Sequence, residues 1–218
     1  MFKDRKDAGQ SLAATLKEYK DKKYVIILAI PKGGVEVGYE VAKYLNAEFS
    51  IIISRKLPFP DNPESGFGAI AEDGSTFIFG FAKKLFSQVE LERILAEQIQ
   101  EIERRIVVLR KGEKFPELKD KTVILVDDGI AMGSTMYASI QLCKNKQAKK
   151  IIVASPVAGQ ETAEQLNSMV DEVAILEKPQ FFQAVAQVYL NWYDVSDEEV
   201  IEILKKASYE NYIKDYAD

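Results

Sequence analysis

VILVDDGIAMGST, residues 123–135, is the stretch of sequence from which the fold can be predicted. Its first four residues form an unbroken, mostly β-branched apolar run, which is typical of a strand buried on both faces. The carboxylates of Asp127 and Asp128 follow, and then a loop of small residues leads into a helix. Because the first N–H groups of a helix lack intrahelical partners and the helix dipole adds positive potential, this loop predicts an anion site. We expect a phosphate joined to a group with vicinal hydroxyls or to Mg²⁺.

Composition limits the classes of function. The 218 residues contain no histidine, which excludes Ser-His-Asp and Cys-His nucleophile systems and histidine-ligated metals. The net charge of −5 argues against nucleic-acid binding. Cys143 is the only cysteine, and no apolar run is long enough to span a membrane. We therefore expect a soluble protein of a reducing, cytoplasmic compartment, without membrane or nucleic-acid partners.

Strands and helices alternate along most of the chain. This order predicts right-handed crossovers and an α/β fold, with a Rossmann-like, mainly parallel sheet flanked by helices. The strands are expected at residues 24–30, 49–53, 122–126, 148–155 and 172–176. Helices are expected at residues 5–20, 35–45 and 87–112, after residue 135, around residues 163–166 and after residue 196.

Two segments interrupt the alternation. Residues 57–82 are rich in proline and glycine, with short β-like pieces around a turn at Asp73-Gly74, and they predict an irregular, mobile flap. Residues 178–195 are rich in aromatic side chains. We interpret residues 1–218 as a single domain, with a core at about 20–177, the flap inserted at 57–82, and a hood and C-terminal helix at about 178–218.

A second glycine-rich loop is expected at the same edge of the sheet. Pro31-Lys32-Gly33-Gly34 follows the first strand, and ligands of open parallel sheets bind where such carboxyl-end loops diverge. Arg55 and Lys56 follow the second strand and would add positive charge. Two anion-binding loops suit a ligand with two separate phosphate groups.

These motifs together resemble the type I phosphoribosyltransferases. Residues 123–135 are similar to the family's phosphoribosyl-diphosphate signature, and AIPKGGV at 29–35 looks like its pyrophosphate loop. Arg55-Lys56 and the flap look like its flexible loop. The resemblance implies transfer of a phosphoribosyl group from phosphoribosyl diphosphate to a nitrogen nucleophile such as a nucleobase, with release of pyrophosphate and Mg²⁺ as the cofactor. It also implies a homodimer.

The resemblance assigns roles to individual residues. Asp127 and Asp128 would hold the ribose hydroxyls, directly or through hydrated Mg²⁺. Lys32, Arg55 and Lys56 would neutralise the departing pyrophosphate and complete the catalytic set. The pyrophosphate would face Lys32, Gly33 and Gly34, where the family often has a non-proline cis peptide. The 5-phosphate would be held by Ala131, Met132, Gly133, Ser134 and Thr135.

The sequence departs from the family pattern at the expected base site. Ala131 stands where the hypoxanthine-guanine branch has an aspartate, and Met132 stands where threonine is common. Asn191 takes the place of a hood carboxylate that contacts metal-bound pyrophosphate in the purine type. The hood aromatics Phe181, Phe182 and Trp192 are the expected base-binding side chains.

Three functions fit these residues. The first is the phosphoribosyltransferase reaction on a small nitrogen base. The second is a regulatory protein that senses phosphoribosyl diphosphate without turnover. The third is a hydrolase of another phosphorylated sugar, because fold does not fix function.

Overall fold

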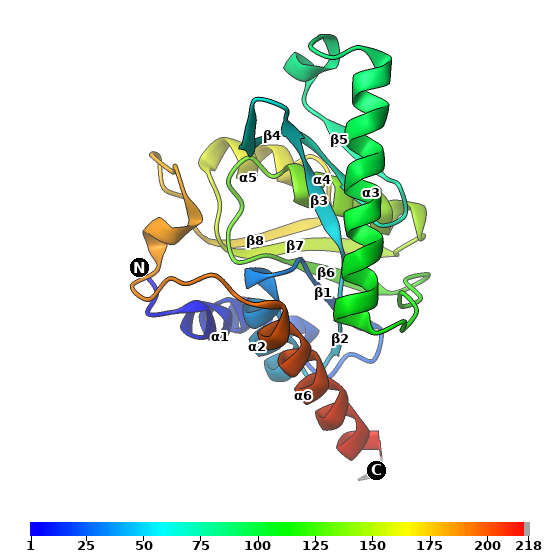
Figure 1. Cartoon of the computed structure of the whole chain (residues 1–218). Coiled ribbons are helices and arrows are strands. Elements are labelled where there is room, and N and C mark those ends of the chain that lie inside the picture. Colours follow the sequence, from blue (N-terminus) through cyan, green and yellow to red (C-terminus); the bar gives the residue numbers. More distant parts are fainter. Residues whose placement is uncertain (216–218) are drawn as a thin grey trace.

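The structure is a computed structural model that describes residues 1–215 and their side chains, except the side chains of residues 63, 64 and 211–215. At its centre lies a sheet with the strand order β2-β1-β6-β7-β8 (Figure 1). All neighbouring strands of this sheet pair in parallel. The predicted α/β fold with a mainly parallel sheet is therefore confirmed.

The element boundaries agree with the predicted order and differ at several ends. The strands are β1 (Val25–Ala29), β2 (Glu48–Ile51), β3 (Ser54–Phe59), β4 (Asn62–Ala71), β5 (Thr76–Ile78), β6 (Thr122–Val126), β7 (Lys150–Val157) and β8 (Glu172–Glu177). The α-helices are α1 (Arg5–Thr15), α2 (Gly33–Leu45), α3 (Gln88–Arg110), α4 (Ser134–Asn145), α5 (Gln160–Asn167) and α6 (Asp197–Asp215). Short 3₁₀ turns are η1 (Lys17–Tyr19), η2 (Gly80–Lys84) and η3 (Val185–Val188). The first helix thus ends before residue 20, and the second strand ends before residue 53.

Both faces of the parallel sheet are covered by helices. Successive side chains of a strand point to opposite faces, so Ile26 and Leu28 of β1 pack with Met136 of α4. Val25 and Ile27 face the other side and pack in the core formed with α1 and α2. Figure 1 shows α1 and α2 on one side of the sheet and α4 and α5 on the other. Burial on both faces explains why these strands are continuous apolar runs.

An antiparallel sheet in the order β3-β4-β5 occupies most of the predicted flap. The prediction of irregular structure is therefore wrong for β3 and the first half of β4, whereas the short β-like pieces expected on both sides of residues 73–74 are confirmed. Leu57, Phe67 and Ile70 are buried in a core that includes residues of α3. Glycine and proline residues interrupt the apolar pattern of this segment, so its burial is not apparent from the sequence. The pairing of β3 with β4 also changes register around Pro58. The turn predicted at Asp73-Gly74 does join β4 to β5.

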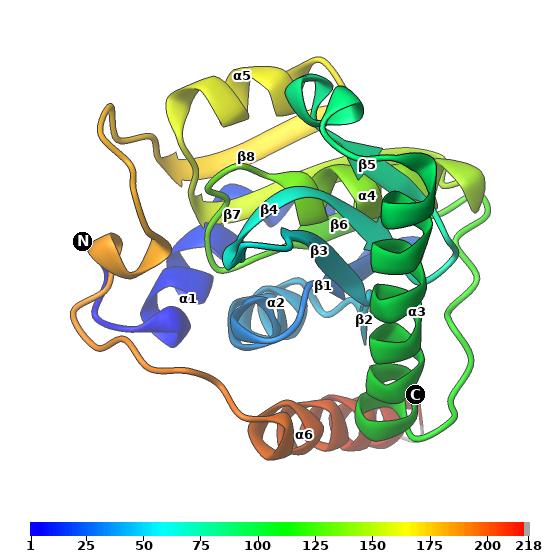
Figure 2. The same ribbon diagram turned by 45° about the horizontal axis from the view of Figure 1, so that its top comes forward.

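The N-terminal segment lies against the hood. The N–H of Phe2 donates to the carbonyl of Val188 over 2.7 Å, and the N–H of Leu190 donates to the carbonyl of Phe2 over 2.9 Å. Figure 2 shows the N-terminus beside η3 and α6 below α2. Within residues 1–215, no helix combines the length and apolar character needed to cross a membrane.

Glu72 and Arg110 form a buried ion pair that ties the end of β4 to the end of α3. Their side chains are 7% and 6% exposed, and the guanidinium of Arg110 donates to Oε2 of Glu72. Oε1 of Glu72 accepts the backbone N–H of Ile53 over 2.9 Å. Burial raises the pKa of Glu72, although the charge of Arg110 acts in the opposite direction. The positive charge of Arg110 therefore stabilises the ionised carboxylate of Glu72 in the core.

Arg110→Met is expected to lower the free energy of unfolding by about 3–5 kcal/mol, because it leaves an unpaired buried charge at Glu72. The double variant Glu72→Gln/Arg110→Met removes both charges and keeps a side-chain oxygen for the N–H of Ile53. We expect it to recover most of the loss. Urea denaturation of the wild type and both variants measures the difference. An Arg110→Met variant as stable as the wild type would contradict this account of the ion pair.

Candidate active site

The loops after β1 and β6 meet at the carboxyl edge of the parallel sheet. Since these two strands are neighbours, Pro31–Gly34 lies next to Asp127 and Asp128. A Cβ built on Gly34 would lie 3.0 Å from both Cα and Oδ1 of Asp127. Glycine permits this approach, because a side chain here would force one loop to move. The Pro31–Lys32 peptide bond is cis, as the family resemblance implies.

The loop after β6 ends at the N-terminus of α4. Gly133 has a φ of +78°, a left-handed conformation that glycine adopts readily, and Ser134 is the first helical residue. The carbonyl of Ala131 accepts the hydroxyl of Thr162 over 2.7 Å, which fastens the loop to α5. The first N–H groups of α4 have no intrahelical partners. Together with the hydroxyls of Ser134 and Thr135, they provide donors for the oxygens of a phosphate.

A cleft of about 360 Å³ lies over this loop. Residues 129–135 and Asp127 line it together with Lys56 of the antiparallel sheet and with Gln183 and Val185 of the hood. The predicted site residues that line the cleft are Lys56, Asp127, Ala131, Met132, Gly133, Ser134 and Thr135. The structure therefore brings the predicted 5-phosphate residues together with one carboxylate and one cation.

The side chains of Arg55 and Lys56 do not lie together. They are adjacent residues of β3, so their side chains point to opposite faces of the strand. Lys56 lines the cleft, whereas Nε of Arg55 donates to Oε1 of Gln98 on α3 over 3.3 Å. Burial lowers the pKa of Arg55, and the charge of Arg105 adds to that effect. The structure thus brings only Lys56 of this pair to the cleft, while Lys32 places its Nζ 3.9 Å from Oδ1 of Asp197.

The three aromatic residues expected to bind the base are dispersed. Phe181 is 89% exposed. Phe182 lines a second pocket, and the ring of Trp192 lies 4.1 Å from the guanidinium carbon of Arg5. Apart from the short η3 turn, the hood has no regular structure between β8 and α6, so its side chains follow no common face. The structure does not assemble these residues into one binding surface.

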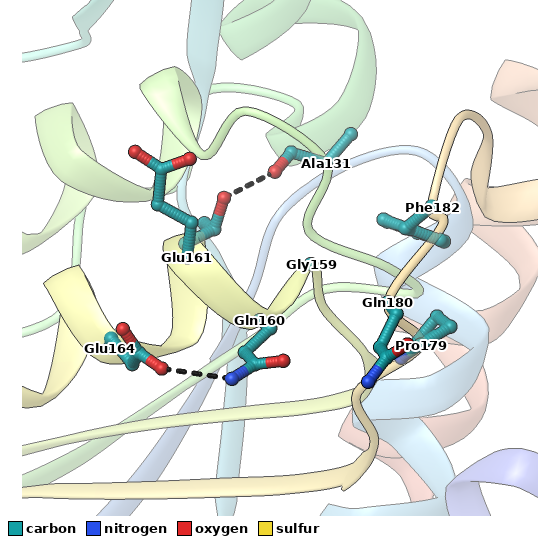
Figure 3. A pocket seen from close by; sticks show the side chains of 9 residues that line it. Ala131, Gly159, Gln160, Glu161, Glu164, Pro179, Gln180 and Phe182 are labelled. Carbon is teal, nitrogen blue, oxygen red and sulfur yellow. Dashed lines mark hydrogen bonds between the residues drawn. The ribbon is translucent and has the colours of Figure 1, made fainter.

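The second pocket, of about 440 Å³, adjoins the loop between β6 and α4 (Figure 3). Its lining is Ala131, Gly159, Gln160, Glu161, Thr162, Glu164, Pro179, Gln180 and Phe182. Nε2 of Gln160 donates to Oε1 of Glu164 over 3.2 Å, and Ala131 lines both this pocket and the cleft. No motif in the sequence points to this pocket, because α5 and the hood supply its walls. Its side chains offer carboxylates and amides, and none of them carries a positive charge.

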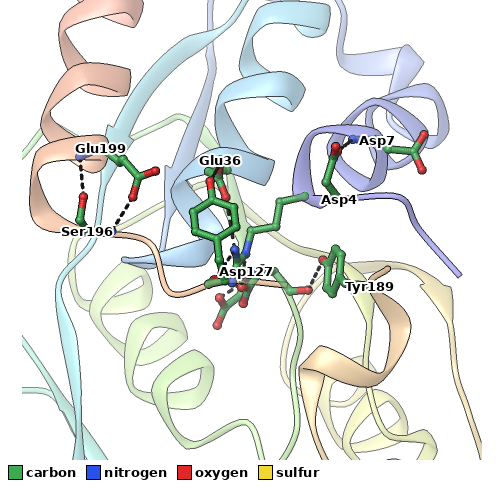
Figure 4. A network of polar contacts seen from close by, with 10 residues as sticks. Asp4, Asp7, Glu36, Asp127, Tyr189, Ser196 and Glu199 are labelled. Atoms are coloured by element: carbon green, nitrogen blue, oxygen red, sulfur yellow. Dashed lines mark hydrogen bonds and ion pairs between the residues drawn. The ribbon is translucent and has the colours of Figure 1, made fainter. Parts of the chain in front are cut away.

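Arg5 also reaches the site, from the first turn of α1. Its side chain is 4% exposed. Nε of Arg5 donates to Oδ2 of Asp128 over 2.7 Å, and Nη1 donates to the carbonyl of Tyr193 over 2.9 Å. Figure 4 shows the surrounding network, in which Glu36, Asp127 and Tyr189 lie close together although they come from different elements. The two aspartates therefore have different surroundings.

Of the two aspartates, Asp128 accepts the hydrogen bond from Arg5, and Asp127 is the one that lines the cleft. Burial raises the pKa of Asp127, and the negative charge of Asp128 raises it further. Its Oδ1 accepts the N–H of Asp128 over 2.9 Å. An ionised Asp127 would gain most from a ligand that brings hydroxyl donors or a cation.

The residues present fit a Mg²⁺ ion that arrives with its substrate. Among residues whose side chains the structure describes, no group of three or more Cys, Asp or Glu could hold a metal. Mg²⁺ commonly keeps several waters and binds through one or two carboxylates together with substrate phosphates. Asp127, which lies beside the N-terminus of α4, meets that requirement, whereas Asp128 is engaged by Arg5.

Comparisons with known proteins agree with this geometry. The family model described as "Phosphoribosyl transferase domain" matches residues 2–191. The protein named "Putative phosphoribosyl transferase" in Mycobacterium tuberculosis strain H37Rv is 35% identical over 209 residues, which is 95% of this chain and 47% of that protein. The chain thus spans about half the length of this curated relative.

A more distant relative and a solved structure also match this chain. The amidophosphoribosyltransferase of Escherichia coli K12 is 23% identical over 71% of this chain and 25% of that protein. The crystal structure of TT1426 from Thermus thermophilus is 36% identical, with a TM-score of 0.79, and the match covers 94% of this chain and 97% of that one. The family model and the 35% identical Mycobacterium protein confirm the family predicted from the signature at residues 123–135. The chain belongs to the phosphoribosyl transferase domain family.

Proposed function

We propose that this chain transfers a phosphoribosyl group from phosphoribosyl diphosphate to a nitrogen atom of a small base and releases pyrophosphate. The observation that carries the proposal is the cleft in which Asp127, the N-terminus of α4 and Lys56 meet. A 5-phosphate at the helix N-terminus would place the ribose beside Asp127. A diphosphate on the anomeric carbon would then extend toward Lys56 and the loop that contains Gly33 and Gly34.

The chemistry is a displacement at the anomeric carbon. The bond from this carbon to a pyrophosphate oxygen breaks, a bond to the acceptor nitrogen forms, and the ribose ring carries positive charge in the transition state. The carboxylate of Asp127 would stabilise that charge, while Lys32 and Lys56 would neutralise the leaving group. Bound Mg²⁺ would supply further charge neutralisation on the phosphates. Since Ala131 replaces an acid, we propose that the acceptor's proton passes to the departing pyrophosphate.

Isothermal titration with phosphoribosyl diphosphate and Mg²⁺, followed by pyrophosphate-release assays with a panel of bases, tests the proposal. We expect Mg²⁺-dependent binding, and release that requires a base. Binding without release under every condition would favour the sensing protein instead. Release of phosphate or pyrophosphate at the same rate without any base would favour the hydrolase. A cytoplasmic location and a homodimer stay predictions from the sequence.

The second pocket leads to an expected order of acceptors. If the base enters beside Ala131, it meets Glu161, Glu164 and two glutamine amides. These groups disfavour an anionic acceptor and favour one that donates N–H groups. Residue 131 itself is an alanine, so it offers no carboxylate to the ring proton of guanine or hypoxanthine.

We therefore expect kcat/KM for adenine to exceed that for orotate, guanine and hypoxanthine by about tenfold or more, which is about 1.4 kcal/mol in transition-state binding. Steady-state rates over adenine, guanine, hypoxanthine, xanthine, uracil and orotate measure this order. Glu161→Gln should reduce the penalty for orotate. Orotate as the best acceptor of the wild type, or guanine or hypoxanthine best by tenfold, would contradict the argument.

A further inference from the structure

The guanidinium of Arg5 is enclosed by groups from three other parts of the chain. Nε donates to Oδ2 of Asp128 over 2.7 Å, Nη1 donates to the carbonyl of Tyr193 over 2.9 Å, and Nη1 lies 3.4 Å from Oε2 of Glu36. The side chain is 4% exposed. Arginine suits such a position, because its planar fork reaches several acceptors at once and stays charged when buried.

Aromatic rings complete the enclosure. The guanidinium carbon of Arg5 lies 4.1 Å from the ring centroid of Trp192 and 5.4 Å from that of Tyr193, distances at which cation–π attraction contributes. The hydroxyl of Tyr189 donates to the backbone carbonyl of Asp128 over 2.6 Å. Both the side chain and the backbone of Asp128 are therefore held by the N-terminal helix and the hood.

The carboxylates of Asp127 and Asp128, the acidic pair, thus differ in their contacts. Asp127 lines the cleft, whereas Asp128 is 13% exposed and is engaged by Arg5. We infer that Arg5 is a positioning residue that serves Asp128 as a built-in counter-ion, so that the pair presents chiefly the carboxylate of Asp127 to phosphoribosyl diphosphate and its Mg²⁺. This inference rests on the proposed function for its substrate.

The positive charge of Arg5 has a consequence for metal binding. Two adjacent uncompensated carboxylates would attract a divalent cation even without substrate, whereas a carboxylate already paired with a guanidinium offers less to the cation. The wild type should therefore bind Mg²⁺ weakly by itself and more tightly with phosphoribosyl diphosphate. Loss of the guanidinium should release Asp128 and strengthen binding of the metal alone.

The test compares Arg5→Met and Arg5→Gln, which lose the charge, with Arg5→Lys, which keeps it. Lys6→Met is the matched control, because Lys6 is the next residue of α1 and is exposed. Isothermal titration with Mg²⁺ alone should show affinity at least tenfold higher in the two neutral variants, and affinity within about threefold of the wild type in Arg5→Lys and Lys6→Met. In turnover, the neutral variants should lose at least tenfold in kcat, with a smaller change in KM for phosphoribosyl diphosphate.

Unchanged Mg²⁺ affinity in the neutral variants would overturn the inference, as would equal gains in Arg5→Gln and Lys6→Met. If Arg5→Met does not fold, the titration is made with Arg5→Gln alone, because the glutamine amide keeps a donor for Asp128. If Arg5→Gln also fails to fold while Arg5→Lys and Lys6→Met behave as the wild type, the role of Arg5 is structural and the inference fails. A wild type that releases no pyrophosphate would overturn the proposed function alone, because the titration with Mg²⁺ requires no turnover.

Discussion

Asp127→Asn is expected to lower kcat/KM for phosphoribosyl diphosphate at least 10³-fold, a loss of about 4 kcal/mol in transition-state stabilisation. The carboxylate lines the cleft beside the loop between β6 and α4, where the ribose ring of the proposed substrate would develop positive charge. Asparagine has nearly the same shape and keeps an oxygen for the N–H of Asp128, which now lies 2.9 Å from Oδ1 of Asp127. Since burial raises the pKa of Asp127, removing its charge should not lower the free energy of unfolding.

Asp128→Asn provides the matched comparison. Its remaining oxygen can still accept from Nε of Arg5, so we expect a loss of no more than about tenfold. Steady-state kinetics with urea denaturation of both variants separates catalysis from stability. An Asp127→Asn variant with the rate of the wild type would remove the carboxylate of Asp127 from the mechanism. Equal losses in the two variants would show that both carboxylates act on the substrate.

The two loops of the site could be predicted from sequence because their signals are local. Unbroken apolar runs mark β1 and β6, and the residues expected to bind the ligand follow each run directly in the chain. Parallel pairing then places the two loops side by side without any further information. Gly33, Gly34 and Gly133 are a further local signal, because glycine permits another segment of the chain to approach closely or the backbone to be left-handed.

The rest of the site depends on contacts between distant segments. Arg5 lies 123 residues from Asp128, and no spacing rule connects them. One signal was available: Arg5, Ala8 and Leu12 share one face of a helix, and a charge on an apolar face usually has a buried partner. The burial of Phe67 could not be predicted in this way, because it requires α3 to cover the antiparallel sheet.

Gly33→Ala is expected to reduce kcat/KM at least 10²-fold, which is about 2.7 kcal/mol, and to lower the free energy of unfolding by about 1–3 kcal/mol. A Cβ built on Gly33 would overlap Oδ2 of Asp128 and would lie 2.7 Å from Nε of Arg5. Neither group can yield freely. Their mutual hydrogen bond is 2.7 Å long, and Arg5 is also held by the carbonyl of Tyr193.

The added methyl group must therefore separate the loop that contains Gly33 from the acidic pair or break the contact between Arg5 and Asp128. Either shift moves the loop expected to bind pyrophosphate relative to the expected ribose site, and a misplacement of about 1 Å at the reacting atoms can cost two orders of magnitude in rate. Gly80→Ala is the control, since a Cβ at Gly80 would meet nothing within 4 Å; it should change the free energy of unfolding by less than about 0.5 kcal/mol and leave the rate unaltered. Kinetics and urea denaturation of both variants decide the matter. A Gly33→Ala variant as active as Gly80→Ala would mean that the loop and the acidic pair need not touch for turnover.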